Sequence, residues 1–335
     1  MARQPLSTGQ AINEALRIAM ESDPDVIVLG EDVAGGGARA AEGVDEMGGV
    51  LGTTRGLVKA FPGRVLDTPI SEMALLGAAV GAAATGLRPV AELMFVDFLG
   101  VCLDPLLNQA AKLRYMFGGK ARVPLTVRTV TGAGMRAAAQ HSQSLYWITA
   151  GIPGLKTVIP SNPADAKGLL LAAIRDDDPV VFCEAKGVLM QQGEVPEGDY
   201  EVPLGRAKVV HEGSDVSLVA FGATVRVALE AAERLAREGT SVEVLDLRSL
   251  QPLDEEAILA TLARTGRLVV IDEAPPRCGI ASDVAALCVD RGFDLLDAPV
   301  KRVTAPHTPV PFSAVLEDAF RPGPERVVAA VRELG

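Results

Sequence analysis

Short apolar runs alternate with helical patterns along almost the whole chain, and this alternation limits the possible folds more than any other feature. In the first half, the apolar runs lie at residues 26–29, 90–95, 125–130, 157–159 and 180–184. Helical patterns lie at residues 103–116, 142–150 and 165–175. Strands that alternate with helices are typical of a parallel sheet covered on both faces, so we predict an α/β fold with mainly parallel sheets.

A polar segment rich in glycine and proline interrupts this pattern at residues 185–205. Beyond it, strand patterns return at residues 216–221, 242–245 and 268–272, and helical patterns at residues 225–238, 254–265 and 280–290. A chain of 335 residues is long enough for about two domains. We therefore predict a first domain over residues 1–190, a linker over 191–204 and a second, smaller α/β domain over 205–335.

Charge and composition exclude several classes of protein. The 43 acidic residues outnumber the 32 Lys and Arg residues, which gives a formal net charge of −11 and no positive field to attract nucleic acid. The long uncharged segment at residues 73–87 is rich in Gly and Ala and is shorter than the ~20 apolar residues that span a bilayer. Charged residues also interrupt the first helical pattern, unlike a secretion signal. We expect a cytoplasmic protein without a membrane span.

The four cysteines, Cys102, Cys183, Cys278 and Cys288, form no CxxC pair and have no histidine at ligand spacing. We therefore expect four reduced, buried thiols rather than a zinc site or a redox pair. The sequence also contains no GxGxxG turn and no GxxxxGK(S/T) loop, so it predicts no dinucleotide or ATP site of its own.

Residues 71–85 form a helical pattern made almost entirely of Ala, Gly, Leu and Val. Gly77 and Gly81 lie one turn apart and would allow another backbone to approach closely. Because this helix is apolar around its whole circumference, we expect it to be buried on every side, at the centre of a domain or at a subunit interface.

Glu72 opens this helix and is the only carboxylate before the long uncharged segment. In a structural interpretation, the helix dipole favours an acid at this position. In a functional interpretation, a half-buried carboxylate holds or shares a proton with a nitrogen of a ligand. The pattern alone is compatible with both.

His141 is one of three histidines and lies between polar residues just before a helical pattern. The neighbours Gln140, Ser142 and Gln143 are compatible with a polar pocket, although a lone histidine is often structural. Residues 176–178 are three aspartates at the end of another helical pattern, where negative charge is unfavourable. Either a solvated turn or a bound cation would explain them.

Six segments, at residues 29–32, 67–72, 86–89, 139–143, 165–170 and 246–254, have the order and spacing found in one enzyme family. On these motifs, the chain resembles the β subunits of thiamine-diphosphate-dependent 2-oxo acid dehydrogenases over nearly its whole length. Residues 91–95, 114–121 and 305–313 look most like the acetoin dehydrogenase branch. Val101 also replaces a polar residue of the pyruvate-type enzymes.

The resemblance implies a transketolase-like pyrimidine-binding domain followed by a transketolase C-terminal-like domain, in an α2β2 heterotetramer. Thiamine diphosphate would be shared with the α subunit. That subunit would hold the diphosphate and its magnesium, because its Gly-Asp-Gly motif followed by Asn is not found in this chain. A dihydrolipoyl acyltransferase core that carries lipoyl groups would be a further partner.

The resemblance also implies roles for single residues. Glu72 matches the family glutamate that hydrogen-bonds a pyrimidine nitrogen of the cofactor, and Met94 and Phe98 match the lining of the aminopyrimidine pocket. His141 matches the active-site histidine near the substrate and the incoming lipoyl group. Backbone oxygens that hold potassium in some relatives correspond to Leu125, Ala173, Ile174, Asp176 and Asp178.

The activity that the resemblance implies is cleavage of acetoin, with transfer of the acetyl fragment to a lipoyl group. One alternative is the β subunit of a pyruvate or branched-chain 2-oxo acid dehydrogenase, which would carry out oxidative decarboxylation. Another is a catalytically silent binding subunit, in which Glu72 and His141 are merely structural.

Overall fold

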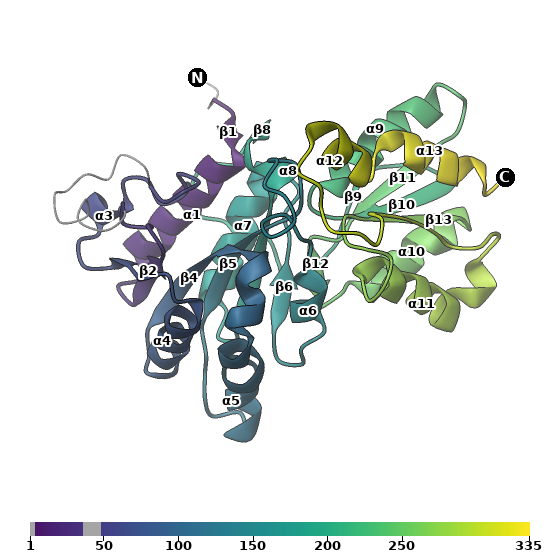
Figure 1. Ribbon diagram of the computed structural model, residues 1–335. Coiled ribbons are helices and arrows are strands. Elements are labelled where there is room, and N and C mark those ends of the chain that lie inside the picture. The colour runs from purple at the N-terminus through teal and green to yellow at the C-terminus, as the bar shows by residue number, and fades with distance from the viewer. Residues whose placement is uncertain (1–3, 36–47) are drawn as a thin grey trace.

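A seven-stranded sheet and a five-stranded sheet form the two halves of the computed structural model, which describes residues 4–35 and 48–335 (Figure 1). The strands of the larger sheet are, in spatial order, β12 (Ser249–Gln251), β6 (Lys156–Val158), β7 (Val180–Ala185), β5 (Thr126–Thr131), β4 (Arg88–Phe95), β2 (Val26–Gly30) and β3 (Val65–Asp67). Those of the smaller sheet are β14 (Lys301–Thr304), β13 (Leu268–Asp272), β10 (Val216–Ala220), β11 (Val242–Asp246) and β9 (Lys208–His211). A separate antiparallel pair consists of β1 (Leu6–Ser7) and β8 (Gln192–Gly193).

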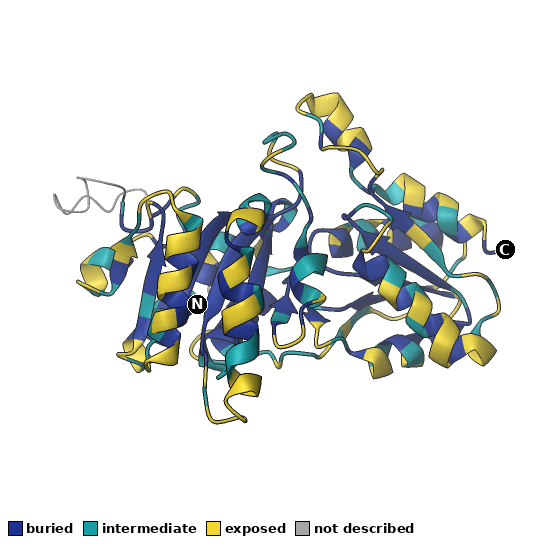
Figure 2. Ribbon diagram, turned by 60° about the horizontal axis from the view of Figure 1, so that its bottom comes forward, coloured by how far each residue is buried: buried dark blue, intermediate teal, exposed yellow. Residues whose placement is uncertain are grey.

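Most strand pairs are parallel, which confirms the predicted fold class. Within the described residues, only β12 in the larger sheet and β9 in the smaller sheet run antiparallel to their neighbours. Every residue of β5, β7, β10, β11 and β13 is buried, as expected for strands that are covered on both faces (Figure 2).

Helices cover both faces of the sheets. The first half contains α1 (Thr8–Ser22), α3 (Leu57–Ala60), α4 (Glu72–Ala84), the 3-10 helix η1 (Val96–Val101), the π-helix η2 (Pro105–Ala110), α5 (Ala111–Met116), α6 (Tyr146–Ala150), α7 (Pro163–Arg175) and α8 (Lys186–Leu189). The second contains α9 (Thr224–Ala236), α10 (Glu255–Thr265), α11 (Ile280–Gly292), η3 (Phe293–Leu295), α12 (Ala314–Phe320) and α13 (Pro324–Arg332). Apolar residues of α1 and α7 share one core of the larger sheet, and those of α4 belong to the core on its other face.

Local sequence signals explain where several helices begin and end. Ser7 caps α1 by accepting a hydrogen bond from the backbone N–H of Gln10, whose side chain accepts one from the N–H of Ser7 in return. At the N-terminus of α10, the side chain of Asp254 accepts a hydrogen bond from the N–H of Ala257. Gly266 ends that helix in a left-handed conformation.

The helix predicted at residues 142–150 is wrong in its first turn, because α6 spans only Tyr146–Ala150. The backbone of Gln143 is already bonded elsewhere. Its N–H donates to the carboxylate of Asp97, and its carbonyl accepts from the N–H of Gly132. Tertiary contacts therefore outweigh the helical pattern at this point.

Helix α4 is not buried on every side, so that prediction is wrong for this chain by itself. Leu75, Leu76 and Ala79 pack into the core, but Met73 and Gly77 are exposed. A Cβ atom added at Gly77 or Gly81 would meet no atom within 4 Å. The face of small residues is therefore open, which excludes the domain centre and leaves the subunit interface as the prediction.

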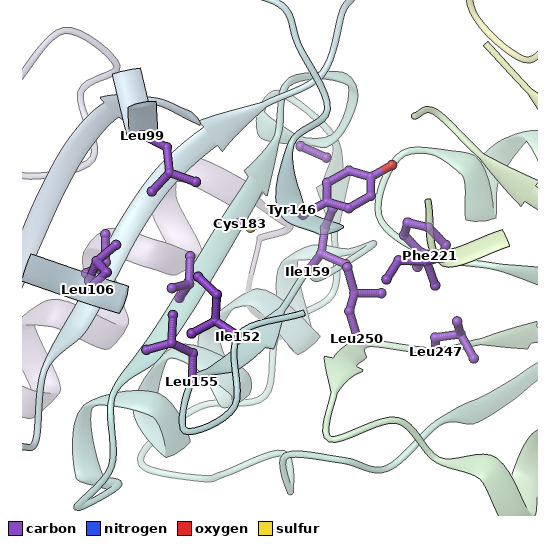
Figure 3. Close-up of a cluster of buried hydrophobic side chains, with 14 of the residues drawn as sticks. Leu99, Leu106, Tyr146, Ile152, Leu155, Ile159, Cys183, Phe221, Leu247 and Leu250 are labelled. Atoms are coloured by element: carbon purple, nitrogen blue, oxygen red, sulfur yellow. The ribbon is translucent and has the colours of Figure 1, made fainter. Parts of the chain in front are cut away.

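The hydrophobic core continues from one half of the molecule into the other (Figure 3). The ring of Tyr146 meets Phe221 edge-on, with 5.5 Å between the ring centroids. The hydroxyl of Tyr146 donates a hydrogen bond of 2.5 Å to Asp272. Strand β12, which belongs to the second half of the chain, pairs with β6 and so extends the sheet of the first half.

Residues 194–207 contain no helix or strand, and they pass over α7. The N–H of Val202 donates to the carbonyl of Gly168, and the hydroxyl of Tyr200 donates to the carbonyl of Ala164. We propose the domain limits 1–190 and 205–335 on this basis, with residues 191–204 as a linker that is packed against the first domain.

Three of the four cysteines are buried, but Cys278 is exposed, so the prediction of four buried thiols is wrong for that residue. Within residues 4–35 and 48–335, no group of three or more His, Cys, Asp or Glu side chains is arranged to hold a metal ion. No helix in this part of the chain is both long enough and apolar enough to cross a membrane.

Candidate active site

Four of the predicted site residues, Glu72, Met94, Phe98 and His141, gather at the carboxyl edge of the larger sheet, where Glu31 also lies. Glu31 follows β2, Glu72 follows the turn after β3, and Phe98 follows β4. The chain leaves β2 toward β3 on one side and leaves β4 toward β5 on the other. The neighbours β2 and β4 therefore form a topological switch point, which is where parallel α/β sheets bind ligands.

Glu72 is the first residue of α4 and is half-buried. Burial raises the pKa of the nearby Glu31, and the negative charge of Glu72 raises it further. Burial likewise raises the pKa of the Cys102 thiol to about 12, again with a contribution from Glu72. A carboxyl group that is partly dehydrated and has a second negative charge nearby retains its proton more readily, and this applies to Glu31.

Met94 and Phe98 form part of an apolar wall at the end of β4. Met94 is buried in the strand, and Phe98 is half-buried in η1. The ring of Phe98 lies edge-on to Phe95, with 6.0 Å between their centroids. The wall continues to the imidazole of His141, which lies 5.1 Å from the Phe95 centroid and 5.4 Å from the Phe98 centroid.

Charged residues hold the backbone at His141 and just after it. The ammonium group of Lys186 donates a hydrogen bond to the carbonyl of His141 and lies 4.8 Å from the centroid of Phe95. Burial lowers the pKa of this amine, whereas the charges of Asp97, Glu273 and Glu317 oppose the shift. Asp97 accepts hydrogen bonds from the backbone N–H and the side-chain amide of Gln143, at 3.2 and 2.9 Å.

Three polar atoms at this edge are buried and have no hydrogen-bond partner among the described residues. They are Oγ1 of Thr68, Oδ2 of Asp97 and Oγ of Ser142. Buried polar atoms in folded proteins usually have a partner, so these atoms fit a site that is completed by a ligand or by water.

The structure thus brings His141 and Phe98 into contact, and it places Met94 at the carboxyl end of β4, close to Phe98 along the chain. Glu72 lies beside Glu31 instead. Within the described part of the chain, no hydrogen bond or ion pair joins Glu72 to His141. The site consists of a carboxylate side and an imidazole side, with the switch point between β2 and β4 on the carboxylate side.

A buried ionic triad behind the site was not predicted from the sequence. Arg128 of β5 has only 1% of its surface exposed and donates to Glu184 of β7 at 2.7 Å and to Glu92 of β4 at 2.8 Å. A third bond, of 3.0 Å, reaches the hydroxyl of Thr53. Burial raises the pKa of Glu184, and the charge of Arg128 opposes this. The available signal was one charge in each of three apolar strand patterns.

Cationic side chains balance all three aspartates at residues 176–178. Lys156 pairs with Asp176 at 2.6 Å, and Arg114 pairs with Asp178 at 2.7 Å. Arg88 pairs with Asp177 at 2.7 Å and lowers its pKa through this hydrogen bond. Arg88 also donates to the carbonyls of Ile174 and Asp176, at 3.3 and 3.1 Å. The side-chain carboxylates of the three aspartates are therefore already paired with Lys and Arg side chains.

The remaining predicted ion positions lie around this turn. The carbonyl of Leu125 accepts from the N–H of Val180, and the carbonyl of Ala173 accepts from the N–H of Asp176. Each carbonyl oxygen has two lone pairs and so retains capacity for a second contact.

A cavity of about 450 Å³ opens next to the imidazole side, between the two halves of the molecule. Its lining includes Gln143 and Ser144 from the first half and Glu273, His307 and Phe320 from the second. No local sequence pattern links Glu273 to this site, because it lies more than a hundred positions from His141 along the chain.

Comparison with known proteins agrees with this architecture. Residues 4–192 match the transketolase pyrimidine binding domain, and residues 205–327 match the transketolase C-terminal domain. A solved chain described as a split gene transketolase, inactive beta4 tetramer, covers 98% of this chain and 98% of its own length, with a TM-score of 0.79 and 25% identity. Fold and site together define a transketolase-type protein.

Curated relatives narrow the class. Over 331 residues, the chain is 62% identical to the acetoin:2,6-dichlorophenolindophenol oxidoreductase subunit beta of Bacillus subtilis, covering 98% of this chain and 97% of that one. It is 43% identical to the 2-oxoisovalerate dehydrogenase subunit beta of the same organism, with 97% of each chain covered. The chain belongs to the family of β subunits of thiamine-diphosphate-dependent acetoin and 2-oxo acid dehydrogenases.

Proposed function

We propose that this chain is the β subunit of an acetoin dehydrogenase. With an α subunit, in an α2β2 heterotetramer, it would cleave acetoin and pass the acetyl fragment to a lipoyl group of a dihydrolipoyl acyltransferase core. The observation that carries this proposal is the position of Glu72, half-buried beside Glu31 at the switch point of a pyrimidine-binding domain. The higher identity to the acetoin enzyme, 62% against 43%, supports the choice of substrate.

Thiamine diphosphate, when bound, would supply the nucleophilic carbon that attacks the carbonyl of acetoin. In this chain, Glu72 would hold a pyrimidine nitrogen, and Met94 and Phe98 would line the pyrimidine pocket. An apolar wall strengthens the contact between a carboxylate and a ring nitrogen, because it lowers the local dielectric constant. We propose that the α subunit holds the diphosphate and its magnesium.

The residues on the carboxylate side fit this task. Burial and the negative charge of Glu72 both raise the pKa of Glu31, so Glu31 retains a proton more readily than a solvated glutamate would. The free hydroxyl oxygen of Thr68 offers a further polar contact at the same edge.

His141 would act on the opposite side, close to the incoming lipoyl group. Contacts with Phe95, Phe98 and Lys186 fix the orientation of its ring and backbone. A fixed imidazole can donate or accept the proton that moves during acyl transfer.

The requirement for an α subunit has independent support. The split-gene transketolase chain with the same fold is described as inactive in a β4 assembly. We propose that this chain alone is likewise inactive, and that the assembled enzyme is cytoplasmic.

The purified chain, mixed with its α partner, tests the substrate. Dye reduction should be fastest with acetoin and at least about tenfold slower with pyruvate or branched-chain 2-oxo acids, since one polar group or methylene changes discrimination by about that factor. Preference for a 2-oxo acid would establish the alternative, oxidative decarboxylation. Absence of turnover with every substrate, in an assembled heterotetramer, would favour a silent binding subunit.

We also propose a potassium site formed by the backbone oxygens of Leu125, Ala173, Ile174, Asp176 and Asp178. It is supported by the convergence of these residues where β5 begins and α7 ends. Potassium chloride should raise the unfolding temperature of the heterotetramer above that in choline chloride of equal concentration, because an ion that binds only the folded state stabilises it. Equal unfolding temperatures in the two salts would contradict the site.

A further inference from the structure

The loop that carries His141 contains residues in an unfavourable backbone conformation, so it depends on contacts with the rest of the protein. It leaves β5 at residue 132 and includes Arg136 and Ala138, which adopt φ values of 57° and 60°. Residues other than glycine rarely occupy this left-handed region, and they persist there when surrounding contacts fix them. The contacts that fix this loop therefore matter for the position of His141.

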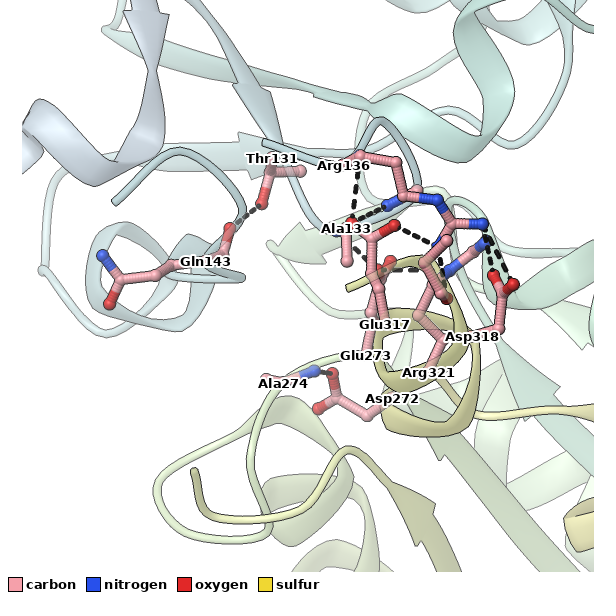
Figure 4. A network of polar contacts seen from close by, with 12 residues as sticks. Thr131, Ala133, Arg136, Gln143, Asp272, Glu273, Ala274, Glu317, Asp318 and Arg321 are labelled. Carbon is pink, nitrogen blue, oxygen red and sulfur yellow. Dashed lines mark hydrogen bonds and ion pairs between the residues drawn. The ribbon is translucent and has the colours of Figure 1, made fainter. Parts of the chain in front are cut away.

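The contacts at the near end of the loop come from the second half of the chain (Figure 4). Glu273, which follows β13, accepts a hydrogen bond of 2.8 Å from the N–H of Ala133. Glu317 of α12 accepts from the N–H of Gly134 at 3.0 Å and from the N–H of Arg136 at 3.2 Å. Its second oxygen pairs with the guanidinium of Arg136 at 2.5 Å.

Glu317 is fully buried, with 0% of its surface exposed. In the described part of the chain, every hydrogen bond of its side chain comes from the loop, from two backbone N–H groups and one guanidinium. A buried carboxylate that accepts charge-assisted hydrogen bonds in fixed directions imposes one geometry on its donors. Both N–H groups belong to the segment in which the left-handed residues lie.

The far end of the loop is held by the first half of the chain. Lys186 binds the carbonyl of His141, and Asp97 binds Gln143 two residues further on. The backbone before His141 is thus held by the second half of the chain, and the backbone at and after His141 is held by the first half. Loss of the Glu317 anchor would free residues 134–138, while the hydrogen bonds of Glu273 to Ala133 and of Lys186 to His141 would remain.

We propose that Glu317 is a positioning residue of the active site, through which α12 of the C-terminal domain sets the place of the His141 imidazole. This rests on the role proposed above for His141. Glu317 itself does not touch the ring, so its effect must pass through the loop backbone.

The test uses Glu317→Gln in the assembled α2β2 enzyme, with Asp318→Asn as the matched control. Asp318 lies next on the same helix and pairs with the same guanidinium, at 2.8 Å, but accepts no backbone N–H from the loop. Two quantities are measured. One is amide hydrogen exchange in peptides covering residues 132–141, and the other is acetyl transfer to a lipoyl domain relative to dye reduction with acetoin.

For Glu317→Gln, we expect exchange to become faster and acetyl transfer to fall about tenfold, because small displacements of a reacting group cause losses of this size. Dye reduction should stay within about twofold, since the role proposed above assigns His141 to the acyl-transfer step. Asp318→Asn should leave both quantities unchanged. Unchanged exchange in Glu317→Gln would overturn the proposal.

A double variant shows whether the effect passes through His141. If it does, adding Glu317→Gln to His141→Ala should cause no further loss of acetyl transfer. Independent, additive losses would overturn the proposal. If His141→Ala alone transfers acetyl groups normally, the assigned role of His141 fails, whereas faster exchange in Glu317→Gln would still support Glu317 as the residue that holds the loop.

Arg136→Ala covers the case in which Glu317→Gln does not assemble. The side chain of Arg136 is 39% exposed, so its removal leaves no buried cavity. It should shift exchange and acetyl transfer in the same direction as Glu317→Gln, by a smaller factor, because the two backbone N–H groups remain bonded. Wild-type values for both quantities would contradict the proposal.

Discussion

At the scale of single residues, Glu72 on the carboxylate side of the site and His141 on the imidazole side depend on different surroundings. Glu72 is half-buried with Glu31 nearby, at the start of a helix whose dipole favours an acid. His141 must keep one orientation on a loop whose backbone is strained. Variants of the two residues should therefore fail in different ways.

Glu72→Gln should lower turnover by about 10²-fold or more, the range expected when an acid–base group is lost. Assembly should stay intact, because the substitution keeps the size of the side chain and Glu72 forms no hydrogen bond within the described residues. Dye reduction and gel filtration with the α subunit measure the two effects. Glu325→Gln, at an exposed ion pair with Arg234, serves as the control. Near-normal turnover of Glu72→Gln would refute the role of Glu72.

His141→Ala should reduce acetyl transfer to a lipoyl domain by about 10²-fold and leave dye reduction nearly unchanged. The physical reason is that the imidazole packs against Phe95 and Phe98 and, within the described residues, forms no hydrogen bond or ion pair with Glu72. His211→Ala is a matched control, since His211 is exposed on β9 of the other sheet. A fall in dye reduction that equals the fall in transfer would contradict the division of roles.

The sequence predicted some of these residues and not others, for reasons that the structure makes clear. Glu72 and His141 stand out because a short motif surrounds each of them. Arg128 and Glu184 were detectable in principle, as lone charges inside apolar strand patterns. Glu317 was not, because its partners lie about 180 positions away and only the packing of the two domains brings them together.

At the scale of elements, the end of β11 carries a buried acid at the contact between the two halves. Asp246 accepts from the hydroxyl of Ser161 at 2.5 Å and from the N–H of Arg248 at 3.0 Å. Burial raises the pKa of Asp246 to about 7. Close by, Arg248 pairs with Asp165 of α7 at 2.7 Å. Protonation of Asp246 is thus linked to folding.

The sign of this linkage gives a prediction. An unfolded aspartate has a pKa of about 3.9, so the folded state holds the proton more tightly, and the contribution to stability is lost as the pH rises through about 7. Between these values the free energy of unfolding should fall by at most about 1.4 kcal/mol per pH unit through this group. Urea unfolding of wild type and Asp246→Asn from pH 5 to 8 measures it. If the free energy of unfolding changed with pH in the same way in wild type and in Asp246→Asn, the linkage through Asp246 would be ruled out.

The triad across β4, β5 and β7 gives a second prediction at this scale. Arg128→Met would leave the buried carboxylates of Glu92 and Glu184 without their cation, which typically destabilises a protein by about 3–5 kcal/mol. The midpoint of urea unfolding should fall accordingly. Arg234→Met, which breaks exposed ion pairs on α9, should change stability by less than about 1 kcal/mol. Equal effects of the two variants would argue against the triad.

Helix patterns were predicted more reliably than helix surroundings. The sequence placed α4, α7, α9 and α10 within a few residues of their observed bounds. It could not tell whether the apolar circumference of α4 faces a core or a partner, because both environments favour the same small residues. The first turn predicted for α6 does not form, because the N–H of Gln143 donates to Asp97 and its carbonyl accepts from the N–H of Gly132, and no local pattern encodes these contacts.

At the scale of the whole molecule, the two domains act as one packed unit. The core is continuous across them, and the loop of His141 is anchored from both sides. The open face of α4 is the surface where we expect another subunit to pack. Order of the elements and fold class followed from the alternating sequence pattern, whereas this mutual anchoring depends on contacts between distant positions.

Strand β12 has a further consequence for how the protein tolerates division. It covers the outer side of β6, yet it is encoded some 90 positions later, beyond the start of the second domain. A fragment that stops at residue 204 would leave β6 with unpaired backbone groups at a bare sheet edge, a common starting point for self-association. Gene fission or truncation at the apparent boundary would therefore yield an N-terminal fragment that tends to self-associate. A fragment that stays soluble has to retain residues 249–251, which cover this edge.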